Sequence, residues 1–242
     1  MTLGEVSKFI VAAVLLGVLG PAPASAAPVE NRLFYPVVET RGTVAVDASG
    51  YHNNGNLRGG VTRRNGKYKF HPVSRDGLFD RIRTAHAPSL NPGSSAFSYG
   101  LRLKIPVDAE WSHSEMAVIR HGDTDTPGGD YKMELVKTAR GTVSAFCDMH
   151  DGDGDGMGYV RGSGRLETIA DGSWHSIACA RVDLDTVSLT IDGHVAERPT
   201  SGDLNAIIGG DPLLIGCQYR FDQIHYREQF VGAMDDIRIT IP

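Results

Sequence analysis

The chain has 242 residues, with 24 basic and 29 acidic side chains and a formal net charge of −5. Acidic and basic residues are mixed and no basic block occurs, which argues against nucleic acid and anionic membranes as partners. Glycine is abundant, at 29 residues, as expected of a protein with many tight turns.

Residues 1–26 have the pattern of a secretory signal peptide. One basic residue, Lys8, precedes an apolar run from residue 9 to 19, and Ala24-Ser25-Ala26 provides small residues for cleavage. The run is shorter than the about 20 residues of a membrane-spanning helix, so we expect no membrane span after cleavage. We therefore expect a secreted, extracellular protein in which residues 27–242 form one domain, because β-sandwiches often reach about 200–250 residues.

The first half of the chain predicts short strands and many turns. Apolar stretches at 34–38, 44–46 and 79–82 are strand-like, and turn formers dominate between residues 47 and 57. The polar segment from Gly59 to Lys69 predicts a loop that exposes Arg63, Arg64 and Lys67.

The strongest strand signal begins at residue 97, where apolar residues alternate with polar ones up to Pro106. Further strand signals follow at 116–119, 131–135, 143–147, 171–181, 187–193 and 230–239, with turns between them. No segment after residue 26 shows a helical period. The pattern predicts an all-β protein with two antiparallel sheets packed as a sandwich.

Four short motifs occur in a recognisable order. They are Asp47-x-Ser49-Gly50-x-x-Asn53-x-Gly55-x-Leu57, Asp171-Gly172-Ser173-Trp174-His175, Val187-x-Leu189-x-Ile191-Asp192-Gly193 and Gly232-x-Met234-Asp235-Asp236-Ile237-Arg238-Ile239. Together they resemble the laminin G-like branch of the concanavalin A-like lectins and glucanases, from about Val44 to Ile239, although Tyr51 and His52 replace the commoner Asn-Gly. The resemblance implies a jelly-roll sandwich with Trp174 in its core. It also implies binding more than catalysis, although this fold hosts lectins, adhesion modules and glycosidases.

The chain has three cysteines, Cys147, Cys179 and Cys217. The first two lie in consecutive strand-like segments, and secreted bacterial relatives often carry cysteines at both places, so the resemblance supports a disulfide between them. Such a bridge would stabilise the fold by roughly 3–4 kcal/mol. The alternative is two buried free thiols. Cys217 is then left over, either buried or pairing between two chains.

The first and last motifs suggest a metal site. First and last strands commonly lie together in the resembling fold, which would bring Asp47 and Asn53 near Asp235 and Asp236. Calcium prefers such oxygen ligands, so we expect a structural calcium ion at this place. The alternative is that Asp47 caps a turn and the two later aspartates are only surface groups.

The last strand contains an irregularity. Met234 is out of phase with the alternating Ile237, Ile239 and Ile241, which predicts a bulge at Asp235-Asp236.

Residues 151–156, Asp-Gly-Asp-Gly-Asp-Gly, match the opening of an EF-hand loop. Position 12 is Gly162 instead of the bidentate glutamate, and no helical pattern flanks the loop. A hairpin tip built from Asp-Gly turns is therefore the favoured interpretation.

The sequence offers little for catalysis. A glycosidase needs two carboxylates about 5–5.5 Å or 6.5–9.5 Å apart, and the E-x-D-x-x-E pattern of related glucanases is absent. Among the acidic residues between 110 and 134, only Glu134 lies in a good strand. We therefore expect no enzyme, and a diverged glycosidase, which would need Glu134 beside a second carboxylate, is the third alternative.

Aromatic side chains in loops are the candidates for stacking on a sugar, although local packing is the alternative for each of them. They are Tyr51, Trp111, Tyr219, Phe221 and Tyr226. The leading hypothesis is a secreted glycan-binding module. The second is a protein-interaction or adhesion module, with a flat apolar patch and dimers linked through Cys217.

Overall fold

The computed structural model describes residues 30–74, 77–122, 127–220 and 225–242, and for residues 219–220 and 225–227 the backbone only. The signal peptide predicted for residues 1–26 lies outside this part of the chain, as does Phe221.

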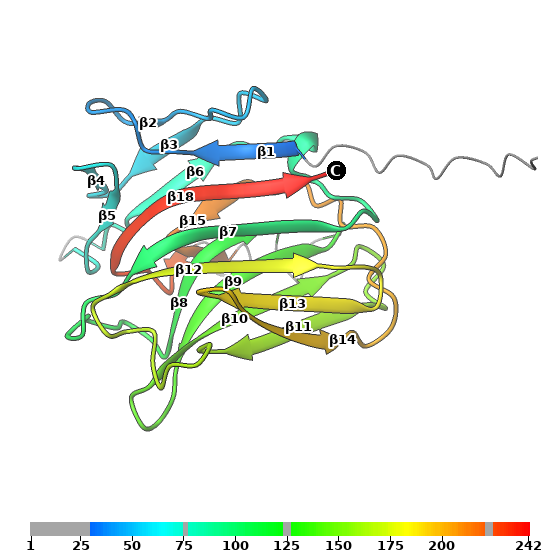
Figure 1. Ribbon diagram of the computed structural model, residues 1–242. Coiled ribbons are helices and arrows are strands. Elements are labelled where there is room, and N and C mark those ends of the chain that lie inside the picture. Colours follow the sequence, from blue (N-terminus) through cyan, green and yellow to red (C-terminus); the bar gives the residue numbers. More distant parts are fainter. Residues whose placement is uncertain (1–29, 75–76, 123–126, 221–224) are drawn as a thin grey trace, which may run out of the picture.

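The described residues form two antiparallel sheets of eight strands each, which confirms the predicted all-β sandwich (Figure 1). The strand order in the first sheet is β14 (His194–Pro199), β13 (Thr186–Ile191), β12 (Trp174–Arg181), β7 (Phe97–Lys104), β18 (Gly232–Ile241), β5 (Tyr68–Phe70) and β4 (Thr62–Arg63), and β1 (Glu30–Tyr35) also pairs with β18.

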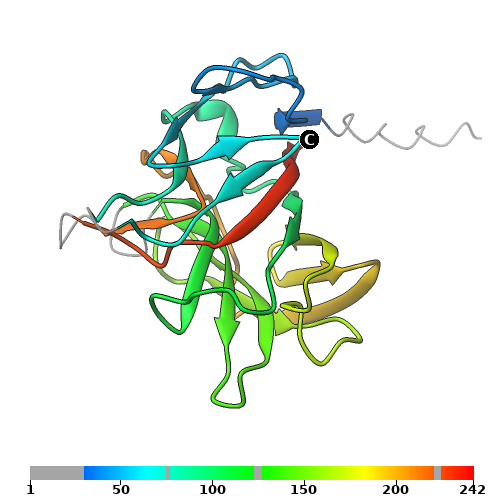
Figure 2. The same ribbon diagram turned by 90° about the vertical axis from the view of Figure 1, so that its left-hand side faces the viewer.

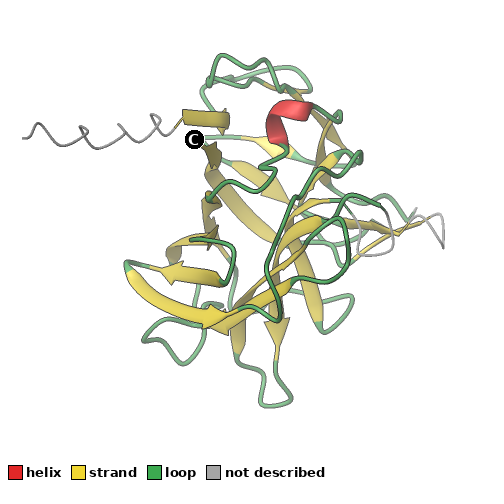
Figure 3. Ribbon diagram, turned by 90° about the vertical axis from the view of Figure 1, so that its right-hand side faces the viewer, coloured by secondary structure: helices red, strands yellow, loops and turns green. Residues whose placement is uncertain are grey.

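The second sheet lies behind the first in Figure 1. Its order is β11 (Met157–Gly162), β10 (Val143–His150), β9 (Asp130–Lys137), β8 (Glu115–His121), β15 (Leu213–Ile215), β6 (Arg81–Thr84), β3 (Gly55–Arg58) and β2 (Val44–Ala45). A separate hairpin joins β16 (Gln218–Arg220) to β17 (His225–Arg227). In the described part of the chain, the one helical turn is a 3₁₀ turn at Pro88–Leu90, drawn in red in Figure 3. None of the described helices is long and apolar enough to cross a membrane.

Alternating side chains of the two sheets fill one shared core. In β7, Phe97, Tyr99, Leu101 and Leu103 are buried in it, as their period of two predicts. A disulfide joins Cys147 of β10 to Cys179 of β12 and confirms the predicted pair. The two strands belong to different sheets and are not paired with each other, so the bridge ties one sheet to the other across the core.

The first and last strands of the described chain lie side by side. Phe34 of β1 pairs with Arg238 of β18, and Tyr35 pairs with Ile237. Figures 1 and 2 both show the C-terminus beside β1. The register of β18 against β7 shifts between Asp235 and Arg238, and Asp236 has a φ of 54°, so the predicted bulge is confirmed.

Some sequence predictions were wrong in this region of the fold. The expected loop at 59–69 contains β4 and the start of β5, because Tyr68 and Phe70 are buried and pair with β18. Arg63 is not exposed. Its side chain is 3% exposed and lies 3.3 Å from Glu39. It also donates a hydrogen bond to the carbonyl oxygen of Val44.

Two predicted positions near the C-terminal half also differ. Trp174 is not a core residue. It is half-buried on the outer face of the first sheet, where Lys67 and Arg102 lie 5.7 and 5.3 Å from its ring. Cys217 is fully buried, which excludes dimers linked through it and leaves the buried alternative. Burial raises the pKa of its thiol to about 12.

Candidate ligand-binding face

The second sheet turns charged residues outward. In β9, Tyr131, Met133 and Leu135 point into the core, so the alternate residues Lys132 and Glu134 lie on the opposite, outer face. A strand of a sandwich normally places solvated side chains on this face. Here Glu134 is only 4% exposed, so the outer face carries ionisable groups that are shielded from water.

Strand register brings outward residues from four strands into one row. Tyr159 of β11 pairs with Asp148 of β10, Asp148 pairs with Lys132 of β9, and Lys132 pairs with Arg120 of β8. We call this row, together with Phe146, Glu134, Asp130 and His150 beside it, the outer face of β8–β11. Because paired residues point to the same side of a sheet, these side chains form one continuous layer, in which Tyr159 is exposed and Arg120, Asp130, Glu134 and Asp148 are buried.

Ion pairs link the charged members of the outer face of β8–β11. Lys132 Nζ lies 3.4 Å from Glu134 Oε1 and 3.3 Å from Asp148 Oδ2. His150 Nδ1 lies 2.8 Å from Asp130 Oδ1. Arg120 lies 4.0 Å from both Asp130 and Glu134. Such a network holds each side chain in a fixed geometry, which is what a preformed polar binding surface needs.

The environment of these groups shifts their pKa values. Burial raises the pKa of Glu134, although Lys132 opposes the shift. Burial would lower the pKa of Lys132, but Glu134 and Asp148 outweigh it and the pKa is raised. The hydrogen bond to Asp130 raises the pKa of His150. Perturbed groups gathered on one face mark it as a candidate functional site.

An aromatic pair borders the charged groups. The rings of Phe146 and Tyr159 lie 6.1 Å apart at an interplanar angle of 37°. Tyr159 is 56% exposed, which is unusual for a tyrosine in the middle of a strand. An exposed ring next to fixed hydrogen-bonding groups is suited to pack on a sugar ring while the polar groups bind its hydroxyls.

Glu134 is not a lone carboxylate, because Asp148 and Asp130 share its face. The second carboxylate that the glycosidase alternative requires beside Glu134 is therefore present. The ammonium group of Lys132, however, lies between Glu134 and Asp148 and pairs with both. A cation at that position neutralises the two carboxylates that hydrolysis would require as acid and base or nucleophile.

Two of the predicted aromatic residues have local partners. The hydroxyl of Tyr51 donates a hydrogen bond to Glu30 Oε2 at 2.6 Å, and the Arg32 guanidinium lies 4.5 Å from the ring centre. Trp111 packs partly against the core, with Lys137 5.7 Å from its ring. The backbones of Tyr219 and Tyr226 are paired in the β16–β17 hairpin, where a loop was expected. The ligand role of all five aromatic residues stays a prediction.

Asp47 organises the turn between β2 and β3. Its carboxylate accepts backbone hydrogen bonds from Phe34 at 2.8 Å, Ser49 at 3.0 Å and Asn53 at 2.9 Å. It also accepts one from the Ser49 hydroxyl at 2.7 Å. The Asn53 amide donates to the Arg32 carbonyl and to Ser89. These contacts are those of a turn-capping residue.

Asp235 and Asp236 lie at the bulge of β18. Asp236 pairs with Arg238 at 2.6 Å, and Asp235 Oδ1 lies 3.7 Å from Arg102 without a hydrogen bond. Burial raises the pKa of Asp235, although Arg102 opposes it. No group of three or more His, Cys, Asp or Glu among the described residues is arranged to hold a metal. Calcium also takes backbone and amide oxygens and water, so calcium at this place stays a prediction.

Residues 151–156 form the tip of the β10–β11 hairpin, as expected. Asp151 Oδ1 accepts the backbone N–H groups of Gly154 and Gly156, and Oδ2 accepts that of Asn205. The first aspartate therefore closes the turn.

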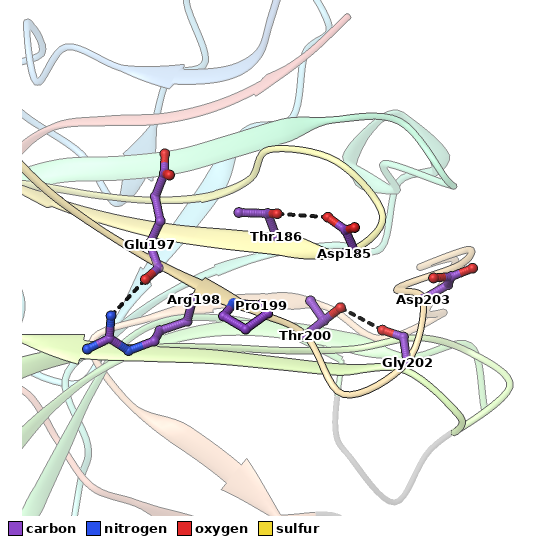
Figure 4. A pocket seen from close by; sticks show the side chains of 8 residues that line it. All are labelled: Asp185, Thr186, Glu197, Arg198, Pro199, Thr200, Gly202 and Asp203. Carbon is purple, nitrogen blue, oxygen red and sulfur yellow. Dashed lines mark hydrogen bonds between the residues drawn. The ribbon is translucent and has the colours of Figure 1, made fainter.

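A pocket of about 570 Å³ lies at the start of β13 and the end of β14 (Figure 4). The Glu197 and Arg198 side chains point to opposite sides of β14 in this view. Thr186 is hydrogen-bonded to Asp185, and Thr200 to the carbonyl oxygen of Gly202. The two threonine hydroxyls in the pocket are thus hydrogen-bonded within the adjacent turns and do not converge on a ligand.

The sequence prediction missed Tyr159, Phe146, Asp148, Lys132 and His150. For Lys132 in β9 and for Phe146, Asp148 and His150 in β10, the signal that could have found them is the alternation of buried apolar residues with polar or aromatic ones. Tyr159 lies in β11, where the same alternation places it on the opposite face from the buried Val160. Only the register between strands shows that these residues meet.

Residues 76–240 match the laminin G-like family model of the concanavalin A-like lectin/glucanases superfamily. The match covers more than half of the chain, so the chain belongs to this superfamily. The first motif, at 47–57, precedes the matched residues. No curated protein sequence matches the chain.

Several solved binding domains have a similar fold. The binding domain of Paraclostridial Mosquitocidal Protein 1 matches with a TM-score of 0.62 and 13% identity, over 88% of this chain and 48% of that one. The botulinum neurotoxin serotype D ligand-binding domain in complex with N-acetylneuraminic acid matches with a TM-score of 0.59 and 13% identity, over 87% and 47%. The serotype G binding domain gives the same four values. The chain spans about half the length of these structures, and at this identity the similarity shows the fold alone.

Proposed function

We propose that the chain is a secreted, non-enzymatic module that binds a glycan on the outer face of β8–β11. The observation that carries the proposal is the exposed ring of Tyr159 in one row with Asp148 and Lys132. An aromatic ring supplies apolar contact, and Lys132 and His150, whose side chains are 16% and 19% exposed, supply fixed hydrogen-bonding groups for sugar hydroxyls.

The chemistry of this face favours a glycan over a protein partner. Protein-binding patches are depleted of charged residues at their centre. The centre of the outer face of β8–β11 instead holds Lys132, Glu134 and Asp148 in contact. This face therefore differs from the flat apolar patch expected of an adhesion module.

Two further observations support the proposal. The structures of similar fold are binding domains, and one of them is a complex with N-acetylneuraminic acid, although the matched half need not hold its ligand. Export is supported by the signal-like residues 1–26 and by the Cys147–Cys179 disulfide, which is typical of an oxidising compartment.

A glycan array probed with the disulfide-bonded mature protein and two variants tests the proposal. We expect the wild type to bind a defined set of glycans, and Tyr159→Ala to lose at least about tenfold in affinity, since central aromatic contacts often contribute more than 2 kcal/mol. Leu78→Ala is the matched control, because it truncates an equally exposed side chain (57%) before β6, and it should bind as the wild type does. Absence of any glycan binding by the wild type, or equal losses in both variants, would contradict the proposal.

A further inference from the structure

The outer face of the first sheet carries a second row of interest. Trp174 of β12 pairs with Lys104 of β7, Lys104 pairs with Ala233 of β18, and Ala233 pairs with Lys69 of β5. Two lysines therefore flank one small side chain. Neighbouring strands lie about 4.8 Å apart, so the two lysine backbones are about 10 Å from each other with a hollow at Ala233 between them.

This hollow belongs to a pocket of about 470 Å³ at the start of β18. Val231, Gly232 and Ala233 form part of its wall, and apolar atoms make up most of the lining. A side chain cannot replace the hydrogen of Gly232, because a Cβ atom would lie 2.3 Å from the Lys104 carbonyl oxygen. Glycine at this position thus allows β18 to approach β7 closely on the core side of the pocket.

A histidine is fixed at the edge of the same pocket. Nδ1 of His71 lies 2.9 Å from Asp80 Oδ2, and the backbone N–H of His71 donates to the same oxygen at 2.7 Å. Asp80 is buried, and it also accepts a hydrogen bond from the backbone of Gly60. Because Asp80 takes Nδ1, Nε2 is the nitrogen that His71 has left for a ligand.

The charges around the pocket define the ligand further. Lys67, Lys69 and Lys104 line the pocket with two carboxylates, Asp108 and Glu110, so its lining has one more cationic than anionic side chain, with the Asp80–His71 pair at the edge left out of this sum. One excess charge suits a ligand with a single negative group. The two carboxylates would repel a polyanion such as a phosphate polymer or an acidic peptide, but they accept hydrogen bonds from hydroxyl groups.

We propose that this pocket binds a carboxylated sugar, one hexose-sized ring bearing a single carboxylate. Lys69 and Lys104 hold the carboxylate, the hollow at Ala233 and Val231 receives the apolar face of the ring, and Asp108 and Glu110 accept hydroxyl hydrogen bonds. The pocket lies on the first sheet, on the side away from the outer face of β8–β11, so this inference does not depend on the proposed function.

The test is a calorimetric titration with methyl glucuronide, with methyl glucoside as the neutral counterpart. We expect the wild type to bind the glucuronide about tenfold or more tightly than the glucoside, because hydrogen bonds to a charged group are stronger than those between neutral groups. Lys69→Glu should remove this preference, and Ala233→Leu, which fills the hollow without changing charge, should weaken both sugars.

Arg198→Glu is the matched control. Arg198 is an exposed cation on β14, in register with Val187 at the opposite end of the sheet from Lys104, and it undergoes the same change of charge. It should keep the wild-type preference. Equal binding of the two sugars by the wild type, equal effects of Lys69→Glu and Arg198→Glu, or full competition by inorganic phosphate at the same concentration would overturn the proposal. Tyr159→Ala should leave this binding unchanged, which separates a failure here from a failure of the proposed function.

Discussion

His175 Nδ1 lies 2.8 Å from Asp192 Oδ2, and this contact joins two of the four sequence motifs. The other ring nitrogen, Nε2, lies 3.0 Å from Asp171 Oδ1. Asp192 also accepts the backbone N–H of Ser176 at 2.8 Å. The histidine thus connects the turn before β12 with the turn after β13, and the residues of both motifs have a structural reason to occur together.

Replacing His175 by glutamine should change how stability depends on pH. Burial lowers the pKa of His175, but the hydrogen bonds to Asp192 and Asp171 outweigh it and raise the pKa. A raised folded pKa stabilises the protein below the unfolded pKa of about 6.5, and this contribution is lost as pH rises through the folded pKa. Urea unfolding at pH 5 and pH 9 should show a larger cost of His175→Gln at pH 5. Equal costs at both pH values would contradict this role.

His121 should make the protein sensitive to acid. Burial and then the charge of His86 lower its pKa to about 4, and neither ring nitrogen has a hydrogen-bond partner in the described chain. As pH falls below about 6.5, the unfolded chain takes up a proton that the folded protein excludes, which costs about 2–3 kcal/mol by pH 4.5.

His121→Phe removes this titration and keeps an aromatic ring against Tyr131, whose ring lies 5.0 Å from that of His121. Urea unfolding between pH 7 and pH 4.5 should show a smaller loss of stability for the variant than for the wild type. Parallel losses would show that other groups account for the acid sensitivity.

Removing the disulfide should destabilise the fold substantially. The Cys147→Ala, Cys179→Ala double variant opens a link between residues 32 positions apart, which corresponds to about 3–4 kcal/mol in the chain-entropy model. A loss of this size lowers the melting midpoint by about 10 °C in a domain of this length. Dithiothreitol should lower the midpoints of the wild type and of Cys217→Ala alike and leave the double variant unchanged. An equal response of the double variant would show that the bridge does not form.

Asp47→Ala should lower the melting midpoint even in EDTA. The substitution leaves three backbone donors and the Ser49 hydroxyl without their acceptor, and each unsatisfied buried donor costs about 1–3 kcal/mol. Asp236→Asn removes the exposed pair with Arg238 and keeps a residue suited to the positive φ at this position, so it should change stability by less than about 1 kcal/mol. Similar effects of the two substitutions would argue against the capping role.

The proposed calcium ion adds an effect that can be separated from the cap. Millimolar calcium should raise the midpoint of the wild type above its value in EDTA, because an ion that binds only the folded form stabilises it. Asp235→Ala should abolish the rise. Identical wild-type midpoints in calcium and in EDTA would contradict the proposed calcium ion, and Asp47 would then act only as a capping residue.

Long strands with a clear period were predictable from the sequence, and short ones were not. β7 has eight residues of regular alternation, whereas β5 and β15 have three each and carry too few residues to show a period. The same alternation could have predicted the orientation of Trp174. His175, Ile177 and Cys179 alternate into the core, so Trp174 must point outward, although its motif suggested a core residue.

The candidate ligand face depends on information that a single sequence lacks. Tyr159, Asp148 and Lys132 become neighbours only through the register of three strands, and a shift of one residue in any of them would turn its side chain to the core. The bulge at Asp235 was predictable because it interrupts a period within one strand.

The affinity of the wild type and of Tyr159→Ala for a glycan selected on the array, measured by isothermal titration calorimetry, tests the central claim most directly. Tyr159 is exposed, so the variant should keep the melting midpoint of the wild type. The account predicts a loss of about tenfold or more in Tyr159→Ala and wild-type affinity in Leu78→Ala. Unchanged affinity in Tyr159→Ala would contradict the assignment of the glycan to the outer face of β8–β11.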